Sequence, residues 1–201
     1  MKRKTRNSEK SRQEIIEKSA PVFNKYGYSG TKMNMIIEAT GYQKGGIYNH
    51  FDSKMDLARA AFKHNFGLLK VPYEAAINKA ESPKIQLIAF IEGFKKYIVN
   101  PPILGGCPLL NMAVEADDTD ESNRLSVKAS FDEWKALIET ILEKGIQSGD
   151  FNANIDTQQE AIFIIASIEG AIMLGQLKRS VKLMLGVADS LQRYIELQIF
   201  R

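Results

Sequence analysis

The sequence contains few of the residues on which enzymes and metal-binding proteins depend. It has one cysteine and two histidines in 201 residues. No serine–histidine–aspartate constellation, metal-ligand spacing or phosphate-binding glycine loop is evident. A single cysteine excludes an intramolecular disulfide framework and is consistent with a reducing compartment. We therefore expect a protein that is not an enzyme and that needs no metal and no other cofactor.

Long apolar runs are also absent. No run of about 18 or more residues is free of charge, so no membrane span is expected. The basic N-terminus has no apolar segment behind it, which argues against a signal peptide. These features predict a cytoplasmic protein with no membrane partner. The length suits one or two domains with a substantial core.

The apolar residues recur at helical spacing along the chain, and no strand alternation is present. This pattern predicts an all-α fold. Ser11 with Glu14 is expected to cap the first helix, and Thr157 with Glu160 a later one. From residue 54 onward, long helices are expected at 54–80, 84–99, 120–148, 158–178 and 181–200, with a short one from Pro108 to Glu115.

Residues 31–54 have the pattern of a helix-turn-helix, the unit that places a helix in the DNA major groove. Thr31 can cap the first short helix through its hydroxyl. Gly41 stands where a helix end favours a left-handed residue. Ile47 and Phe51 are four residues apart, so they are expected on the buried side of the second helix.

The run from Gly41 to Phe51, GYQKGGIYNHF, with Ser53 and Lys54 after it, resembles the signature of TetR/AcrR-type transcriptional regulators. The preceding Phe23–Thr31 looks like that family's end of helix 1 and start of helix 2. The resemblance implies an N-terminal three-helix helix-turn-helix DNA-binding domain at 1–56. It also implies a C-terminal helical ligand-binding and dimerisation domain at 57–201.

The same resemblance implies which residues contact an operator in double-stranded DNA. Matching family positions predict phosphate contacts from Thr31, Lys32, Tyr48, His50 and Lys54. Gln43, Lys44 and Asn49, with Gly45 beside them, are expected at base edges. The sequence departs from the commonest pattern at Gln43, where serine is frequent, and at Gly46, where a larger residue is usual. A second glycine in a short helix costs on the order of 1 kcal/mol, so this helix is expected to be loose.

Charge is concentrated in the same segment. Residues 1–56 have a net charge of +5, whereas the remaining residues have −2. A basic segment that coincides with a DNA-binding motif is expected of a protein that contacts phosphates.

Two C-terminal helices are candidates for self-association. The helix at 158–178 is apolar nearly all round, so it must be covered on several sides. With 181–200 it could give a four-helix interface in a homodimer, in which Ala166 and Gly170 allow close approach. The alternative is that both helices are the core of a monomeric bundle. A dimer on a palindromic site is the usual route to affinity.

The resemblance also implies a small-molecule effector in the helical body, at 60–175. Aromatic and methionine side chains suit an apolar, adaptable cavity. Taken singly, each candidate is expected to be plain core rather than pocket wall, and Glu169 is either a polar anchor, a solvent-facing residue or an interface residue. The candidates are Phe62, Phe66, Phe90, Phe94, Met112, Trp134, Phe163, Glu169 and Met173.

Two further features have a functional and a structural interpretation. Cys107 lies at the expected start of a short helix, where the dipole can lower a thiol pKa, so it is either a reactive sensor or an inert buried residue. An acidic cluster could attract a divalent cation or complement a helix dipole, and we expect the second. Its members are Glu115, Asp117, Asp118, Asp120 and Glu121.

These observations predict a ligand-responsive transcriptional regulator. By the family default it is a repressor that binds a palindromic operator as a homodimer and is released by a small, largely apolar molecule. The alternative is a helical scaffold or signalling module in which DNA binding is vestigial.

Overall fold

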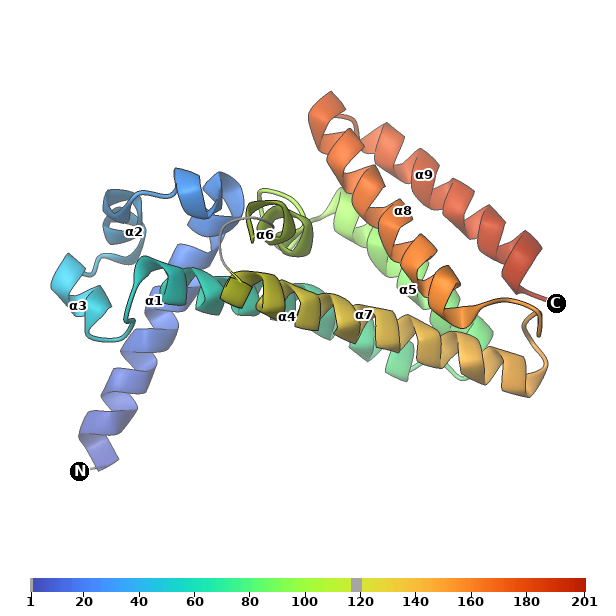
Figure 1. Cartoon of the computed structure of the whole chain (residues 1–201), viewed down its shortest axis with the longest axis horizontal. Coiled ribbons are helices and arrows are strands. Elements are labelled where there is room, and N and C mark those ends of the chain that lie inside the picture. The colour runs from blue at the N-terminus through green and yellow to red at the C-terminus, as the bar shows by residue number, and fades with distance from the viewer. Residues whose placement is uncertain (1, 117–120) are drawn as a thin grey trace. The chain divides into compact units, whose positions relative to one another are not determined.

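The computed structural model describes residues 2–116 and 121–201, with side chains described from residue 7 onward. The described residues form nine α-helices and one π-helical turn, and they contain no strand. The all-α prediction is therefore confirmed. In chain order the elements are α1 Lys2–Gly30, α2 Met33–Thr40, α3 Lys44–Tyr48, α4 Lys54–Asn78, α5 Pro83–Val99, α6 Pro108–Ala116, α7 Glu121–Ser148, α8 Thr157–Lys178, α9 Val181–Tyr194 and the π-helical turn Ile195–Ile199 (Figure 1).

The backbone groups into two compact units. The first unit consists of Met1–Leu68 and Ile103–Val127, and the second unit of Leu69–Pro102 and Lys128–Arg201. Helices α4 and α7 therefore contribute residues to both units. The functional division expected after residue 56 stays a prediction, because these units are defined by backbone packing alone.

Three expected helix starts are wrong in detail. Helix α1 begins at Lys2 rather than near Ser11, because residues 2–10 are mostly good helix formers with no breaking residue among them. The N-cap of α2 is Lys32, since the Thr31 hydroxyl donates to the carbonyl of Gly27 instead. The N-cap of α8 is Asp156, whose Oδ1 accepts hydrogen bonds from the amides of Gln158 and Gln159.

The core of the first unit forms where α1, α2, α3 and α4 meet. Its centre consists of fully buried side chains from each helix, among them Ile15, Ile36, Ile47 and Leu57. Because α3 has only five residues, its place depends on this core rather than on its own helical stability.

The core of the second unit is largely aromatic and aliphatic. The rings of Tyr73 on α4, Phe90 on α5 and Trp134 on α7 meet edge to face, with centroids 5.1–5.3 Å apart. Helices α8 and α9 lie side by side, and α9 also packs on α5 (Figure 1).

Among the described residues, α8 is long and apolar enough to cross a membrane by length and composition alone. The core helix of a soluble protein meets the same criterion.

Candidate functional site

The turn between α2 and α3 has the geometry of a helix-turn-helix. Gly41 adopts a left-handed conformation, with φ of 77°, and its amide donates to the carbonyl of Ile37. Glycine takes this conformation without the steric penalty of other residues, so it ends α2 cleanly. On α3 and just beyond it, Ile47 and Phe51 are 1% and 2% exposed, as their spacing predicts.

A polar network fixes this turn to α1. The Tyr42 hydroxyl donates to Glu14, 3.1 Å away, and Glu14 pairs with Lys18 at 2.7 Å. Lys18 also donates to the carbonyl of Thr40. The hydrogen bond from Lys18, and after it the one from Tyr42, lowers the pKa of Glu14 below its ordinary value. The carboxylate therefore stays charged and holds both partners in place.

The buried side of α3 leaves a polar surface opposite it. Six of the nine predicted DNA-binding residues are exposed, and they are Lys32, Gln43, Lys44, Gly45, Tyr48 and Asn49. His50 is half-buried. Apart from Lys32, which precedes α2, these hydrogen-bonding and cationic groups lie on α3 or beside its ends, which is the arrangement that contacts base edges and phosphates in a major groove.

Lys54 and Thr31 have structural partners instead. The Lys54 ammonium donates to the carbonyls of Tyr28 and Thr31, each at 2.7 Å, and lies 4.2 Å from the centroid of the Tyr28 ring. Burial lowers its pKa from the ordinary value. Thr31 is 1% exposed. Their predicted phosphate contacts stay untested, but this geometry makes both residues supports for the start of α2 and α4.

Glu115 on α6 is a functional candidate that we did not predict in this role. Its carboxylate accepts hydrogen bonds from the amides of Tyr28 and Ser29, at the end of α1. The neighbouring Gly27 has φ of 70°, and a Cβ there would lie 2.5 Å from Glu115 Oε1. Helix α6 is thereby attached to the segment that precedes α2. Nothing local in the sequence indicates this contact, because the partners are 86 and 87 residues apart.

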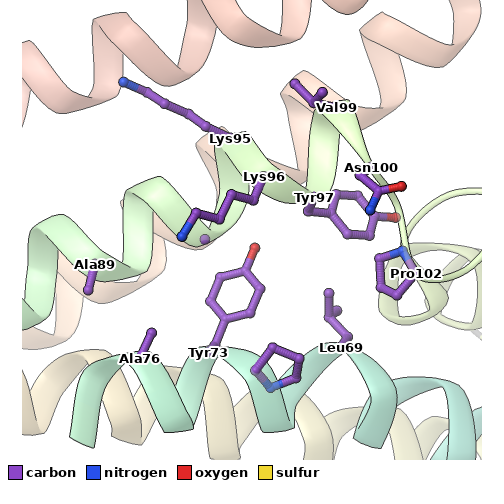
Figure 2. Close-up of a pocket in the computed structure, with 12 residues that line it drawn as sticks. Leu69, Tyr73, Ala76, Ala89, Lys95, Lys96, Tyr97, Val99, Asn100 and Pro102 are labelled. Carbon is purple, nitrogen blue, oxygen red and sulfur yellow. The ribbon is translucent and has the colours of Figure 1, made fainter. Parts of the chain in front are cut away.

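The second unit contains an open pocket of about 670 Å³ between α4 and α5. This volume lies in the range of roughly 300–1,000 Å³ that is typical of small-molecule sites. Figure 2 shows Tyr73 and Ala76 entering it from α4, and Ala89 and Lys96 from α5. The complete lining is Leu69, Pro72, Tyr73, Ala76, Ala89, Gly93, Lys95, Lys96, Tyr97, Val99, Asn100 and Pro102.

The nine residues that we predicted for an effector site do not line this pocket. Phe90, Phe94 and Trp134 are buried in the second unit, and Phe90 and Trp134 pack behind Tyr73. Phe62 and Met112 line a space of only about 20 Å³ in the first unit, and Phe66 is buried there too. Glu169 is half-buried on α8, whereas Phe163 and Met173 are 45% and 50% exposed. The predicted ligand residues thus stay untested.

An apolar stripe runs along the exposed side of α8. Ile162, Met173 and Leu177 are 38%, 50% and 73% exposed, and Ala166 and Gly170 continue the same stripe between them. The spacing of three and four residues places all five on one helical face. Phe163 and Leu174 widen it. A contiguous exposed apolar surface of this kind is a candidate interaction site.

Two other candidates are only partly described by the structure or are buried in it. Cys107 is 2% exposed, which favours an inert buried residue over a sensor thiol. Of the acidic cluster, Asp117, Asp118 and Asp120 lie outside the described residues, and Glu121 pairs with Arg124 at 2.6 Å. Within the described residues, no group of three or more histidine, cysteine or acidic side chains could hold a metal ion.

Known proteins resemble this chain over nearly its whole length. Residues 15–61 match the model for bacterial regulatory proteins of the tetR family, and residues 83–191 match the model for a tetracyclin repressor-like C-terminal domain. A TetR transcriptional regulator from Chloroflexus aurantiacus J-10-FL is 36% identical, with a TM-score of 0.91 over 97% of this chain and 98% of that one.

Two more relatives agree with that match. A TetR-family regulator from Cytophaga hutchinsonii is 33% identical, with a TM-score of 0.86 over 97% of this chain and 98% of its own. The HTH-type transcriptional repressor DhaR of Mycobacterium sp. (strain GP1) is 26% identical over 169 residues, which is 84% of each chain.

Proposed function

Because the chain belongs to the TetR family of transcriptional regulators, we propose that it is a cytoplasmic repressor that binds a palindromic operator as a homodimer. A small, largely apolar effector then releases it from DNA. The observation that carries the DNA-binding part is the polar, exposed side of α3 above the buried Ile47 and Phe51.

The DNA contact is tested with variants of two exposed asparagines. Asn49 lies beside the end of α3, and Asn78 lies at the end of α4 in the second unit. Asn49→Ala should weaken binding to the DNA upstream of the protein's own gene by about five- to a hundredfold, the cost of one good base contact. Asn78→Ala should leave the affinity unchanged. Equal affinities of the two variants would remove α3 from base recognition, and an absence of any DNA binding would favour the helical scaffold.

The proposed homodimer uses α8 and α9. The apolar stripe of α8 is exposed in a single chain, and covering it with the same stripe of a second copy would remove it from water. A dimer supplies the two α3 helices that the two half-sites of a palindromic operator, about 34–36 Å apart, require.

The interface is tested by placing one charge on it. Ala166 and Ala129 are both exposed, on α8 and α7. Ala166→Lys should give a folded monomer at micromolar concentration by light scattering, because an unpaired charge buried in an interface costs several kcal/mol. Ala129→Lys should stay dimeric. A native chain that is monomeric at this concentration would contradict the proposal.

The pocket between α4 and α5 is the proposed effector site. Pro72 on α4 lines the pocket. Lys54, at the start of the same helix, donates a hydrogen bond to the carbonyl of Tyr28 and so supports the helix-turn-helix. An effector that favours the conformation with low DNA affinity shifts the population toward it. A tenfold loss of operator affinity needs about 1.4 kcal/mol of differential binding.

The switch is tested by titrating small apolar and amphipathic compounds while reading thermal stability and DNA release together. The proposal expects that compounds which stabilise the protein also lower its DNA affinity. Compounds that stabilise it and leave DNA affinity unchanged would show a binding site without a switch.

A further inference from the structure

We propose that the pocket between α4 and α5 selects a small amphipathic anion, with its apolar body against Tyr73 and its carboxylate at Lys96. This inference rests on the proposed effector role of the pocket and adds the chemical class of the compound. It is based on the shape of the pocket wall and on a difference between two neighbouring lysines, of which one forms ion pairs and the other, among the described residues, forms none.

The wall of the pocket is apolar and fixed in shape. Tyr73 is held from behind by Phe90 and Trp134, at centroid distances of 5.3 and 5.1 Å. Gly93 on α5 allows this ring to approach closely, since a Cβ there would lie 2.9 Å from Tyr73 Cε1. A flat, rigid aromatic surface of this kind suits an apolar ring or chain.

Lys95 lines the pocket, but its ammonium already forms ion pairs with two carboxylates. Its ammonium lies 3.0 Å from Asp189, 3.3 Å from Glu92 and 2.7 Å from the Gln192 side-chain oxygen. Figure 2 shows the Lys95 side chain on the opposite side of α5 from Lys96. Lys95 therefore fixes α5 to α9 and offers no charge to a bound compound.

Lys96 differs from its neighbour. It is exposed, it lines the pocket, and within the described part of the chain its ammonium forms no ion pair. Glu92, one turn before it on α5, is engaged by Lys95. In Figure 2 the Lys96 side chain runs from α5 toward the space above Tyr73. Among the described residues, Lys96 thus supplies the lining with an ammonium that no ion pair engages.

The lining contains two lysines and no aspartate or glutamate. A cationic compound would meet the positive charge of Lys96 with no carboxylate of the lining to offset it. A carboxylate would instead form a charge-assisted hydrogen bond with the ammonium while its apolar part covers Tyr73. The charge pattern therefore favours an anion over a neutral or cationic compound of the same shape.

The test uses three compounds of one shape and different charge. They are 4-butylbenzoate, 4-butylbenzamide and 4-butylbenzamidinium, whose head groups are all planar, each titrated by calorimetry into the full-length protein. The benzoate should bind about fivefold more tightly than the amide, the upper range for a partly exposed ion pair, and the amidinium compound should bind most weakly. Equal affinities, a preference for the cation or binding of none of the three would overturn the proposal.

Variants identify the group responsible. Lys96→Gln should reduce the benzoate affinity to that of the amide, and Lys96→Glu should reverse the order so that the cation binds best. Lys79→Gln changes the net charge equally at an exposed position outside the lining and should preserve the wild-type order. If Lys79→Gln also lost the wild-type order of the three affinities, the order would depend on the overall charge of the protein, and a role for Lys96 would be overturned.

Shape and regulation are separated from charge in two further measurements. Gly93→Ala should displace Tyr73 and weaken the benzoate and the amide by the same factor; a change in their ratio instead would contradict the assigned positions. DNA release by the benzoate is recorded in parallel. Charge-selective binding without DNA release would support the anion site and refute the proposed switch, whereas DNA release by all three compounds alike would refute the anion site only.

Discussion

The two units are stabilised by different kinds of contact. Of the buried polar side chains in the described part of the chain, six lie in the first unit, and only Ser130 lies in the second. Asn24 and Asn65 in the first unit bind backbone carbonyls 45 to 82 residues away. The second unit relies on stacked and edge-to-face rings instead. Directional hydrogen bonds specify one geometry more narrowly than apolar packing does, so we expect substitutions of buried polar residues in the first unit to cost more than conservative apolar substitutions in the second.

The largest effect that would test this contrast comes from Asn24. Its amide donates to the carbonyls of Leu104 and Gly106, at 2.8 and 2.9 Å. Asn24→Leu should lower the free energy of unfolding by about 2–4 kcal/mol, because a buried and a part-buried carbonyl lose their donor. Ile138→Leu, at a fully buried site of the second unit, should cost less than about 1.5 kcal/mol. Chemical denaturation measures both, and equal costs would contradict the contrast.

A smaller effect is expected at Lys54. Lys54→Met removes two hydrogen bonds to backbone carbonyls and should lower the free energy of unfolding by about 1–2 kcal/mol. DNA binding should weaken with little change in its salt dependence. The exposed Lys32 is the matched case, since Lys32→Ala should keep the stability and reduce the slope of log affinity against log salt by about one. A slope reduced by one in Lys54→Met would restore Lys54 as a phosphate contact.

A stabilising substitution is expected at Gly46, inside α3. A Cβ there would meet only Tyr42 Cδ1, at 3.7 Å, which is an ordinary contact. Gly46→Ala should therefore raise the free energy of unfolding by about 0.5–1 kcal/mol through the helix propensity of alanine. Thermal and chemical denaturation measure the change. A loss of stability would mean that α3 requires a glycine for its backbone geometry. The first unit would then contain backbone strain in addition to its specific hydrogen bonds.

The smallest effect is a dependence on pH. The pKa of Glu14 in the folded protein lies below its ordinary value of 4.5. Its carboxylate therefore stabilises the fold above pH 4.5, and this contribution is lost as the pH falls below that value. Glu14→Gln should lose less stability than the wild type between about pH 5 and pH 3. Tyr42→Phe removes one donor to Glu14, so its loss of stability over this pH range should lie between those of the wild type and of Glu14→Gln. Three identical profiles of stability against pH would exclude the network as a determinant of stability.

Local sequence signals predicted the helix-turn-helix well. Gly41 marks the left-handed turn, and the spacing of Ile47 and Phe51 identifies the buried side of α3, because both features depend only on neighbours along the chain. The same reasoning failed at Thr31. Its hydroxyl had two acceptable partners within a few residues, and the sequence does not say which one the backbone will bring closer.

The pocket could not be predicted in this way. Aromatic content directed us to Phe94 and Trp134, which are core, because large apolar side chains fill space more often than they border it. Tyr73 and Lys96 line a pocket only because residues of two helices leave a gap where they meet. In the described part of the chain, Lys95 is paired and Lys96 is not because Asp189, 94 residues further along the chain than Lys95, binds the lysine on the other side of α5 from the pocket.

The first unit is built from two separate stretches of sequence, and this has a consequence while the protein is being made. Asn24 is synthesised early, but its partners Leu104 and Gly106 follow only after residues 69–102, which belong to the other unit. At roughly 5–20 residues per second, translation leaves an interval on the order of seconds. During that interval α1 lacks α6, so the face of α1 that α6 covers is open to chaperones and to premature self-association. The nascent chain therefore completes its first unit only after residues 69–102 of the second unit have been synthesised.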